Sequence, residues 1–377
     1  MKPMNTSTQT PSHHIHENLG VWASSEIPLV SVIVPNYNHA HFLPERFLSI
    51  RSQTFKDYEL IVLDDASSDH SLEIIRNELS DFPHLLMTND RNSGSPCSQW
   101  LKGIKKARGR YIWIAESDDS CPPTFLATIL ECMGQEVLLS YCRSSEIDAN
   151  GTHISEDSFY WPEAFDSKLW KKSFSISSDQ FCRRFLTQGN VIPNASAVIF
   201  RRDQALTCMS IQPILGNFLF AGDWLFWLHY LTNTDGHVCY IPNVQSWFRS
   251  HSTTTRALSR DKARASRHIS EFCQVDSMIS DYQPEQRLRK CQHRMLSPGW
   301  DWIFVEYIQR IKPSIFELLI GHGLHGSLRL QFPLRLILSR QVHSHAFPRL
   351  SRLIYGACLT WRIGQAKAIG YIKQLLA

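Results

Sequence analysis

The sequence predicts an α/β fold in which a mostly parallel sheet is flanked by helices and followed by a C-terminal helical region. Three observations support this prediction. Short apolar runs rich in β-branched residues recur between residues 29 and 115, as in strands that are covered on both faces. Segments with apolar residues at helical spacing separate these runs. Strands and helices that alternate at this spacing form right-handed βαβ units, and hence a parallel sheet.

The first two predicted strands are each followed by a helix. The first strand covers 29–34 and ends in the polar loop 35–38, and the helix 43–53 carries apolar side chains on one face. The second strand covers 58–63. Residues 67–69 are Ser, Ser and Asp, which are typical cap residues, so they predict the start of the next helix.

The third and fourth strands complete the parallel part of the predicted sheet. The second helix is expected to end at Leu79, and a short strand follows at 85–87. Turn-forming Gly and Pro residues then precede a helix from Ser98 to Ala107. The fourth strand covers 111–115 and leads directly into acidic residues.

Length and composition indicate the broad class of the protein. The chain has 377 residues, 43% of them hydrophobic and 20% charged, an ordinary globular balance for two domains or one large one. The net charge of +4 is too small to indicate a nucleic-acid-binding protein. Neither G-x-G-x-x-G nor G-x-x-x-x-G-K-S/T follows the first strand, which disfavours a dinucleotide-binding oxidoreductase and a P-loop NTPase.

The cysteines and the apolar segments favour a cytoplasmic protein. Ten cysteines are scattered without a C-x-x-C pair, so we expect reduced thiols and no metal cluster or disulfide scaffold. The most apolar stretch, 218–231, is interrupted by Asp223 and His229, whereas a membrane span needs about 18 apolar residues. The N-terminus lacks the pattern of a signal peptide.

Two segments flank the main domain, which covers residues 29–255. Residues 1–28 are rich in Ser, Thr, His, Asn and Gln and are predicted to be a flexible tail. Residues 256–377 hold 19 of the 39 Lys and Arg residues but only 8 of the 35 Asp and Glu residues. This basic region is predicted to be helical. Its helices either pack on the main domain with solvated basic faces, or make peripheral contact with an anionic membrane at its inner face.

Polar residues follow three of the predicted strands at the point where each strand ends. Asn36 and Tyr37 follow the first strand, Asp64 and Asp65 the second, and the Glu-Ser-Asp-Asp segment 116–119 the fourth. Parallel strands present their carboxyl ends at one edge of a sheet, where ligands bind. One acidic cluster would be explained as a helix cap, but several at one edge predict a binding site.

In order and spacing, five parts of the chain resemble family 2 glycosyltransferases of the GT-A fold, a Rossmann-like nucleotide-diphospho-sugar transferase fold. The resemblance covers about residues 29–255. It departs from the family pattern at Glu116, where the family has the first Asp of D-x-D-D, and in the loop that leads to Gln99 and Trp100. The matching segments are 30–38 (VSVIVPNYN), 59–69 (ELIVLDDASSD), 109–119 (GRYIWIAESDD), 194–202 (NASAVIFRR), and 222–224 (GDW) with 247–251 (WFRSH).

The resemblance implies an inverting, metal-dependent glycosyltransferase of the hexosyltransferase type. Such an enzyme moves a sugar from a nucleotide-sugar donor, with UDP-sugars favoured, to a glycan or lipid-linked acceptor in cell-envelope polysaccharide biosynthesis. Two alternatives stay open: a sugar-phosphate nucleotidyltransferase, and a glycan-binding or scaffold protein without activity. The first needs a Gly-rich basic loop after the first strand, which residues 35–38 do not provide. The substitution at Glu116 keeps the second open.

The acidic segment 116–119 predicts a cation site. A divalent cation neutralises the leaving diphosphate, and hard cations prefer oxygen ligands. We therefore expect Glu116, Asp118 and Asp119 to bind Mg²⁺ or Mn²⁺, with Asp118 as the most direct ligand. The alternative is a solvated acidic loop. The resemblance also implies that His251 reaches the metal or the diphosphate, although a lone His is as often structural.

Further residues receive donor-binding roles from the resemblance. Tyr37 would stack on the nucleobase and Asn36 would contact the ribose, while Asp65 would accept a hydrogen bond from the imide N–H of uracil or thymine. Arg249 would pair with phosphate. The full set of implied donor-binding residues is Pro35, Asn36, Tyr37, Asp65, Asp118 and Arg249.

Asp223 is the predicted general base that deprotonates the acceptor hydroxyl. It lies in the aromatic segment 218–227, where loss of solvation is expected to raise its pKa toward a useful value. A helix N-cap is the other explanation, because 224–231 has a helical pattern, and the two roles are compatible. One base, one metal and direct attack on the anomeric carbon imply inversion, with no covalent nucleophile.

Overall fold

The computed structural model forms two compact units, one of residues 1–186 and 190–257 and the other of residues 187–189 and 258–377. In the second unit, the described positions between 264 and 279 are helical, as predicted. The other predicted helical stretches of the basic region lie outside the described residues. Within the described part of the chain, no helix is both long and apolar enough to cross a bilayer. The structure describes residues 13–18, 26–155, 162, 166, 168–252 and 254, and ten positions between 264 and 279.

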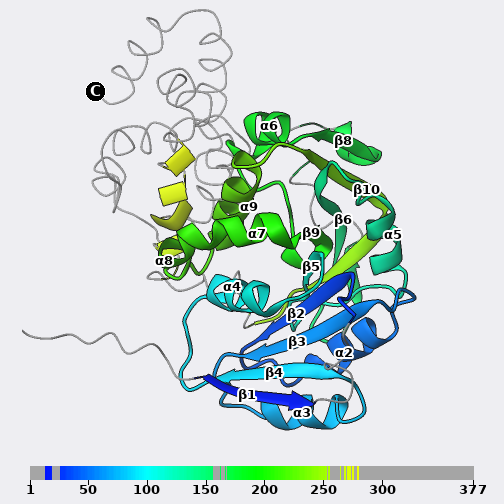
Figure 1. The fold of residues 1–377 in the computed structure, drawn as a ribbon, viewed down its shortest axis with the longest axis vertical. Coiled ribbons are helices and arrows are strands. Elements are labelled where there is room, and N and C mark those ends of the chain that lie inside the picture. The colour runs from blue at the N-terminus through cyan, green and yellow to red at the C-terminus, as the bar shows by residue number, and fades with distance from the viewer. Residues whose placement is uncertain are drawn as a thin grey trace, which may run out of the picture. The chain divides into compact units, whose positions relative to one another are not determined.

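One mixed sheet runs through the first unit (Figure 1). Its strands lie in the order β1-β4-β3-β2-β5-β9-β6-β10-β8, and β7 pairs with β6. The strands are β1 His13–Asn18, β2 Val30–Asn36, β3 Tyr58–Asp64, β4 His84–Asn89, β5 Tyr111–Ile114, β6 Val137–Ile147, β7 His153–Ser155, β8 Phe174–Ser177, β9 Val198–Arg201 and β10 His237–Arg249.

The predicted parallel sheet forms the first half of this sheet. Strands β4, β3, β2 and β5 are parallel neighbours. Beyond β5 the directions are mixed, because β9 is antiparallel to both β5 and β6, whereas β10 is parallel to β6 and antiparallel to β8. β1 pairs antiparallel with β4. It lies inside the segment predicted as a flexible tail, and pairing through backbone groups explains how a polar segment can join a sheet edge.

Helices cover both faces of the sheet (Figure 1). Helices α2 and α5 pack on one face together with α3, and the apolar side chains of β2 that belong to this cluster are Val30, Val32 and Val34. Helices α4, α7 and α9 lie on the other face. The helices are α2 Leu43–Arg51, α3 Ser71–Glu78, α4 Pro96–Lys106, α5 Phe125–Glu131, α6 Ser178–Phe181, α7 Arg202–Thr207, α8 Gln212–Leu215 and α9 Gly222–Thr232.

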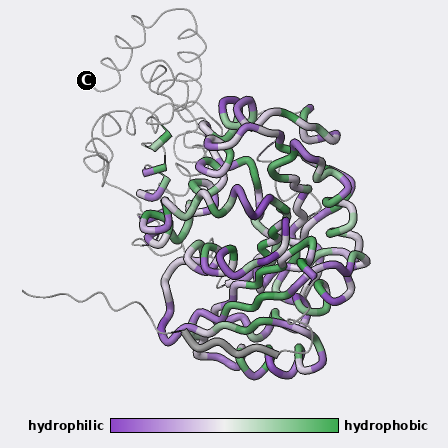
Figure 2. Tube along the Cα trace, in the orientation of Figure 1, coloured by the Kyte–Doolittle hydropathy of each residue, from purple (hydrophilic) through white to green (hydrophobic). Residues whose placement is uncertain are grey.

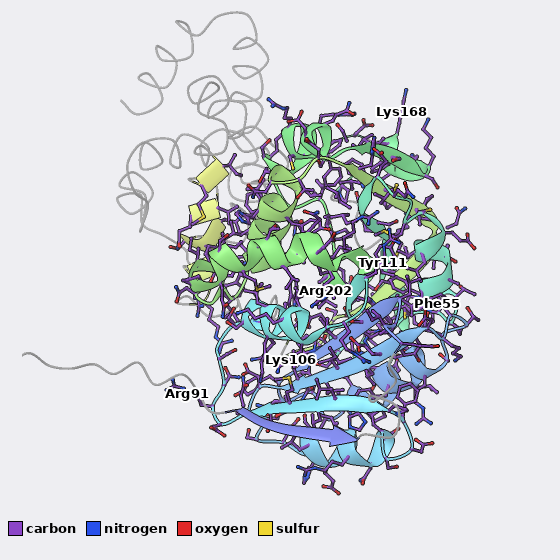
Figure 3. All side chains as sticks on the ribbon, viewed as in Figure 1. Phe55, Arg91, Lys106, Tyr111, Lys168 and Arg202 are labelled. Carbon is purple, nitrogen blue, oxygen red and sulfur yellow. The ribbon has the colours of Figure 1, made fainter. Side chains whose placement is uncertain are left out.

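Close packing seats α4 directly on the central strands. A Cβ at Gly103 would lie 2.5 Å from Ile33 Cγ2, so only glycine allows this approach. Figure 2 shows that the central strands beneath are strongly hydrophobic. Helices α4 and α7 lie next to each other on this face, with Lys106 near the end of one and Arg202 at the start of the other (Figure 3). The C-terminal half of α4 is therefore held closely against the central strands.

Candidate active site

The first turn of α4 contacts the residues that follow two different strands. Gln99 Nε2 donates a hydrogen bond of 2.8 Å to Asp65 Oδ1, at the end of β3. Trp100 Nε1 donates a hydrogen bond of 2.7 Å to Glu116 Oε1, after β5. Adjacent residues of a helix are close in space, so these two contacts hold the two acidic segments beside one helical turn.

The same turn also meets the start of α9. Gly222 is the first residue of α9, and a Cβ there would lie 2.5 Å from Cys97 Sγ. The Trp100 ring packs on Phe226 of the same helix, with ring centroids 6.0 Å apart. Asp223 follows Gly222 directly. Residues 97–100 of α4 thus contact two acidic segments that were predicted at the sheet edge, those of Asp65 and Glu116, and also the start of α9 beside Asp223.

Asp65 is buried and its carboxylate accepts several hydrogen bonds from the loop before α4. Ser93 donates to it from its backbone N–H, at 3.0 Å, and from its hydroxyl, at 2.7 Å. The Asn89 side chain also donates to Oδ1, in addition to Gln99. The loop that departs from the family pattern is therefore the one that surrounds the predicted base-binding carboxylate.

The loop after β2 places the other predicted donor-binding residues. Pro35 and Asn36 are buried at the end of β2, and Asn36 Nδ2 donates to Asp64 Oδ2 at 2.8 Å. Asn36 Oδ1 is buried and has no hydrogen-bond partner in the described structure. Tyr37 is 45% exposed. An exposed ring beside a buried amide is compatible with the nucleoside-binding roles predicted for both residues.

Three residues form a candidate metal site. His251 Nε2 lies 3.1 Å from Asp118 Oδ2, and His39 completes the group, with one ligand atom of each residue within 4.8 Å of the others. Two imidazoles and one carboxylate suit a divalent transition metal such as Mn²⁺ better than Mg²⁺, which prefers oxygen ligands. The predicted pair of Asp118 and His251 is brought together; His39 was not predicted.

The three acidic groups of segment 116–119 differ in their electrostatics. Burial, followed by the charge of Asp118, raises the pKa of Glu116 to about 8. The same two causes raise the pKa of Asp119 to about 6. At Asp118 burial also acts to raise the pKa, but His39 and His251 outweigh it, so the pKa lies below its ordinary value. Asp118 is therefore the carboxyl group of the three that ionises most readily.

Glu116 and Asp119 take part in hydrogen bonds that shape the acidic segment. Asp119 Oδ2 accepts from Asn194 Nδ2 at 2.9 Å, and its Oδ1 accepts from the backbone N–H of Arg249 at 3.0 Å. The backbone carbonyl of Glu116 accepts from Arg46 Nε at 2.9 Å, and Arg46 is fully buried. The contacts of Asp119 and the hydrogen bond from Trp100 to Glu116 Oε1 favour supporting roles for both carboxyl groups, whereas their direct binding of a metal stays a prediction.

Strand β10 brings Arg249 and His251 to the acidic segment. Ser120 and Trp247 exchange two backbone hydrogen bonds, of 3.0 and 2.8 Å, which join this strand to the end of the segment. Arg249 is 1% exposed, and its Nε donates to the carbonyl of Asp118 at 2.7 Å. The predicted contact of Arg249 with a phosphate stays a prediction, and the burial of its side chain favours a structural task.

Asp223 is the second residue of α9, and the N-cap of this helix is Ala221, so the explanation of Asp223 as an N-cap is wrong. Its Oδ1 accepts a hydrogen bond of 2.7 Å from the backbone N–H of Trp224, as a residue at a helix start can. Its Oδ2 accepts one of 2.8 Å from Asn190 Nδ2. Asp223 is only partly buried, while Trp224 and Trp227 are buried in the core. The aromatic residues are thus core residues, whereas Asp223 keeps part of its surface exposed.

Substitution of Gly222 tests the contact between α4 and α9. Gly222→Ala is expected to lower the free energy of unfolding by about 1–3 kcal/mol, because the new methyl group would overlap Cys97 Sγ. Chemical denaturation measures this loss. Cys97→Ala in the same chain should recover much of it, since the overlapping atom is removed. An equal loss in the single and the double variant would show that the two residues do not meet.

The chain is similar to known glycosyltransferases. Residues 31–202 match the model of glycosyl transferase family 2. An abequosyltransferase of Salmonella typhimurium is 28% identical over 181 residues, which are 47% of this chain and 54% of that protein. A chondroitin synthase of Escherichia coli is 28% identical over 145 residues, which are 38% of this chain and 21% of that protein. The chain spans about half or less of the length of these curated relatives.

A solved structure shares the fold. The crystal structure of residues 1–349 of Staphylococcus aureus TarS in complex with UDP-GlcNAc has a TM-score of 0.50 and 17% sequence identity, and the match covers 89% of this chain and 92% of that one. Together with the sheet and its flanking helices, this likeness confirms the predicted GT-A fold.

Proposed function

Residues 31–202 belong to glycosyl transferase family 2, and on this basis we propose that the protein transfers a sugar from a nucleotide-sugar donor to a glycan or lipid-linked acceptor. A UDP-sugar is the favoured donor, because Asp65 and Tyr37 suit a pyrimidine base that carries an imide N–H. Polysaccharide synthesis is the favoured setting, since the curated relatives include a chondroitin synthase and an abequosyltransferase.

One observation carries this proposal. Residues 97–100 of α4 contact the base-binding segment at Asp65, the acidic segment at Glu116 and the start of α9 beside Asp223. A sugar-nucleotide has three parts in the same sequence: the base, the diphosphate and the anomeric carbon that reacts. The contact of all three protein segments with one helical turn supports a donor that reaches from one segment to the next.

His39, Asp118 and His251 are the proposed ligands of a divalent cation. Their donor atoms are mutually close and Asp118 is ionised, so the residues fit such a cation. When bound, the cation supplies Lewis-acid stabilisation of the leaving diphosphate. Two segments supply the histidine ligands: His251 lies two residues after the end of β10, and His39 lies in the loop after β2.

Asp223 is the proposed general base. Asn190 and the N-terminus of α9 hold its carboxylate, which can take the proton of the acceptor hydroxyl. The acceptor oxygen then attacks the anomeric carbon while the bond to the diphosphate breaks on the opposite face. A single displacement of this kind inverts the configuration at the anomeric carbon, and general-base catalysis contributes about 10²–10⁴-fold to the rate.

Donor binding tests the proposed function. In a thermal-shift series of UDP-, GDP- and dTDP-sugars with Mn²⁺, we expect a UDP-sugar to raise the melting temperature most, because a ligand that binds only the folded state stabilises it. The same donor should be hydrolysed slowly in the presence of Mn²⁺ and not in the presence of a chelator. Pyrophosphate release from a nucleoside triphosphate and a sugar phosphate would instead identify a nucleotidyltransferase. No response to any nucleotide would support a protein without activity.

A further inference from the structure

The guanidinium group of Arg249 joins three parts of the first unit. Its Nε donates to the backbone carbonyl of Asp118 at 2.7 Å, and its Nη1 donates to the carbonyl of Asp148 at 3.0 Å. Its Nη2 forms an ion pair with Glu45 of α2. With an exposed fraction of 1%, the group has no face that is open to solvent. Three of its nitrogen atoms are thus committed to the protein.

The backbone of Arg249 also holds the acidic segment. Its N–H donates to Asp119 Oδ1 at 3.0 Å. Arg249 therefore contacts the acidic segment twice: its side chain binds the backbone carbonyl of Asp118, and its backbone N–H binds the side chain of the next residue, Asp119. These two hydrogen bonds fix the backbone at Asp118, whose carboxylate is the proposed metal ligand.

Phe42, the residue before α2, connects Arg249 with His251. The Arg249 guanidinium carbon lies 5.2 Å from the centroid of the Phe42 ring, within cation–π range. The same ring lies 4.4 Å from the imidazole of His251, measured between centroids. The start of α2 thus packs against both Arg249 and the histidine that faces Asp118.

A phosphate contact would require Arg249 to give up these partners. A buried guanidinium that loses its hydrogen bonds is strongly destabilised, and here the carboxylate of Glu45 already provides its counter-charge. The planar guanidinium group of arginine donates hydrogen bonds to several oxygen atoms in a fixed geometry, whereas the ammonium group of lysine does not. The contacts therefore indicate that Arg249 orients the residues of the site and does not bind the substrate.

We propose that Arg249 and Glu45 are positioning residues that hold Asp118 and His251 in the geometry of a metal site. Glu45 acts through Arg249, because its ion pair orients the guanidinium group. Its own side chain is 41% exposed. Because this proposal rests on the proposed function, its test must separate the two. Binding of Mn²⁺ in the absence of any nucleotide does so, since a phosphate-binding residue has no part in that equilibrium.

The experiment measures the dissociation constant of Mn²⁺ for the full chain by electron paramagnetic resonance, which detects the free ion. For Arg249→Lys we expect it to rise by about 10–100-fold, as is typical when a residue that orients metal ligands is replaced. Glu45→Ala should raise it less, and Glu45→Gln, which keeps an acceptor oxygen, should recover part of the loss. Glu73→Ala is the matched control, because Glu73 is an exposed helical glutamate paired with a surface histidine.

Each outcome decides one claim. If the wild type binds Mn²⁺ and the Arg249 and Glu45 variants bind it equally well, the positioning role is wrong and Arg249 is free to serve the donor phosphate. If the wild type itself binds no Mn²⁺, the metal site of the proposed function fails as well. Melting curves accompany every variant, and Glu45→Ala keeps the test valid where Arg249→Lys does not fold, because Glu45 lies at the surface.

Discussion

Asp223→Asn is expected to reduce sugar transfer by about 10²–10⁴-fold while donor binding stays unchanged. The amide cannot accept the proton of the acceptor hydroxyl. Its remaining oxygen can still accept a hydrogen bond from Trp224 or Asn190, so the local fold should survive. Product formation at saturating donor and acceptor measures the effect, and calorimetry with UDP measures the binding.

Asp203→Asn is the matched control for this substitution. Asp203 lies in the first turn of α7, and its Oδ1 accepts a hydrogen bond of 2.9 Å from the next backbone N–H, as Asp223 does in α9. Both variants thus lose a carboxylate at the start of a helix, but only Asp223→Asn loses the proposed general base. Equal activity of the two variants would show that Asp223 serves only to stabilise the first turn of its helix.

Asp118→Asn is expected to raise the dissociation constant of Mn²⁺ by more than about 100-fold, beyond the usual effect of a residue that only orients ligands. The ionised carboxylate between two histidines is lost, and transfer should disappear with the metal. Glu116→Gln should change Mn²⁺ binding little, because Glu116 has a raised pKa and accepts a hydrogen bond from Trp100, which Gln can also accept.

The comparison of these two variants identifies the metal carboxylate. If Glu116→Gln abolishes Mn²⁺ binding and Asp118→Asn does not, the role assigned to each residue is reversed. Loss of binding in both variants would instead show that the two groups share the cation, as the acidic segment alone predicts. Titration of Mn²⁺ against both variants under the same conditions distinguishes these results.

The first half of the sheet was predictable because its signals are local. Each strand from β2 to β5 is a buried apolar run, and each connecting helix has a periodic apolar face, so residues 29–115 show the alternation directly. The later strands also contain buried apolar runs, but their neighbours in the sheet do not follow from their order along the chain. β9 is only four residues long, and its antiparallel pairing with β5 and β6 depends on contacts between distant parts of the chain. β1 joins the edge through its backbone, which a polar sequence does not reveal.

The positions of the site residues were predictable where they depend on the ends of strands. The sequence places Asp65 and Asp118 at the sheet edge because each follows a strand. His39 was missed because its role depends on tertiary structure, although it directly follows the polar segment 35–38. The burial of Arg249 could not be predicted, because its partners Glu45 and Asp148 are more than a hundred residues away.

The two departures from the family pattern are connected in the structure. Glu116 replaces the first Asp of the acidic motif, and Trp100 belongs to the unusual segment that begins α4; the two side chains share a hydrogen bond of 2.7 Å. The neighbouring Gln99 binds Asp65. The side chain of Glu116, which is longer than that of Asp, therefore accepts a hydrogen bond from the indole N–H of Trp100, so the two departures from the family pattern depend on each other.

A crystal structure with Mn²⁺ and UDP tests most directly whether these scattered groups form one site. We expect an anomalous scattering peak of Mn²⁺ in direct contact with the Asp118 carboxylate and the His251 imidazole, with the uracil next to Asp65 and the diphosphate between the metal and Asp223. A Mn²⁺ peak or a nucleotide bound away from Asp118, with Asp223 facing no part of the ligand, would contradict it.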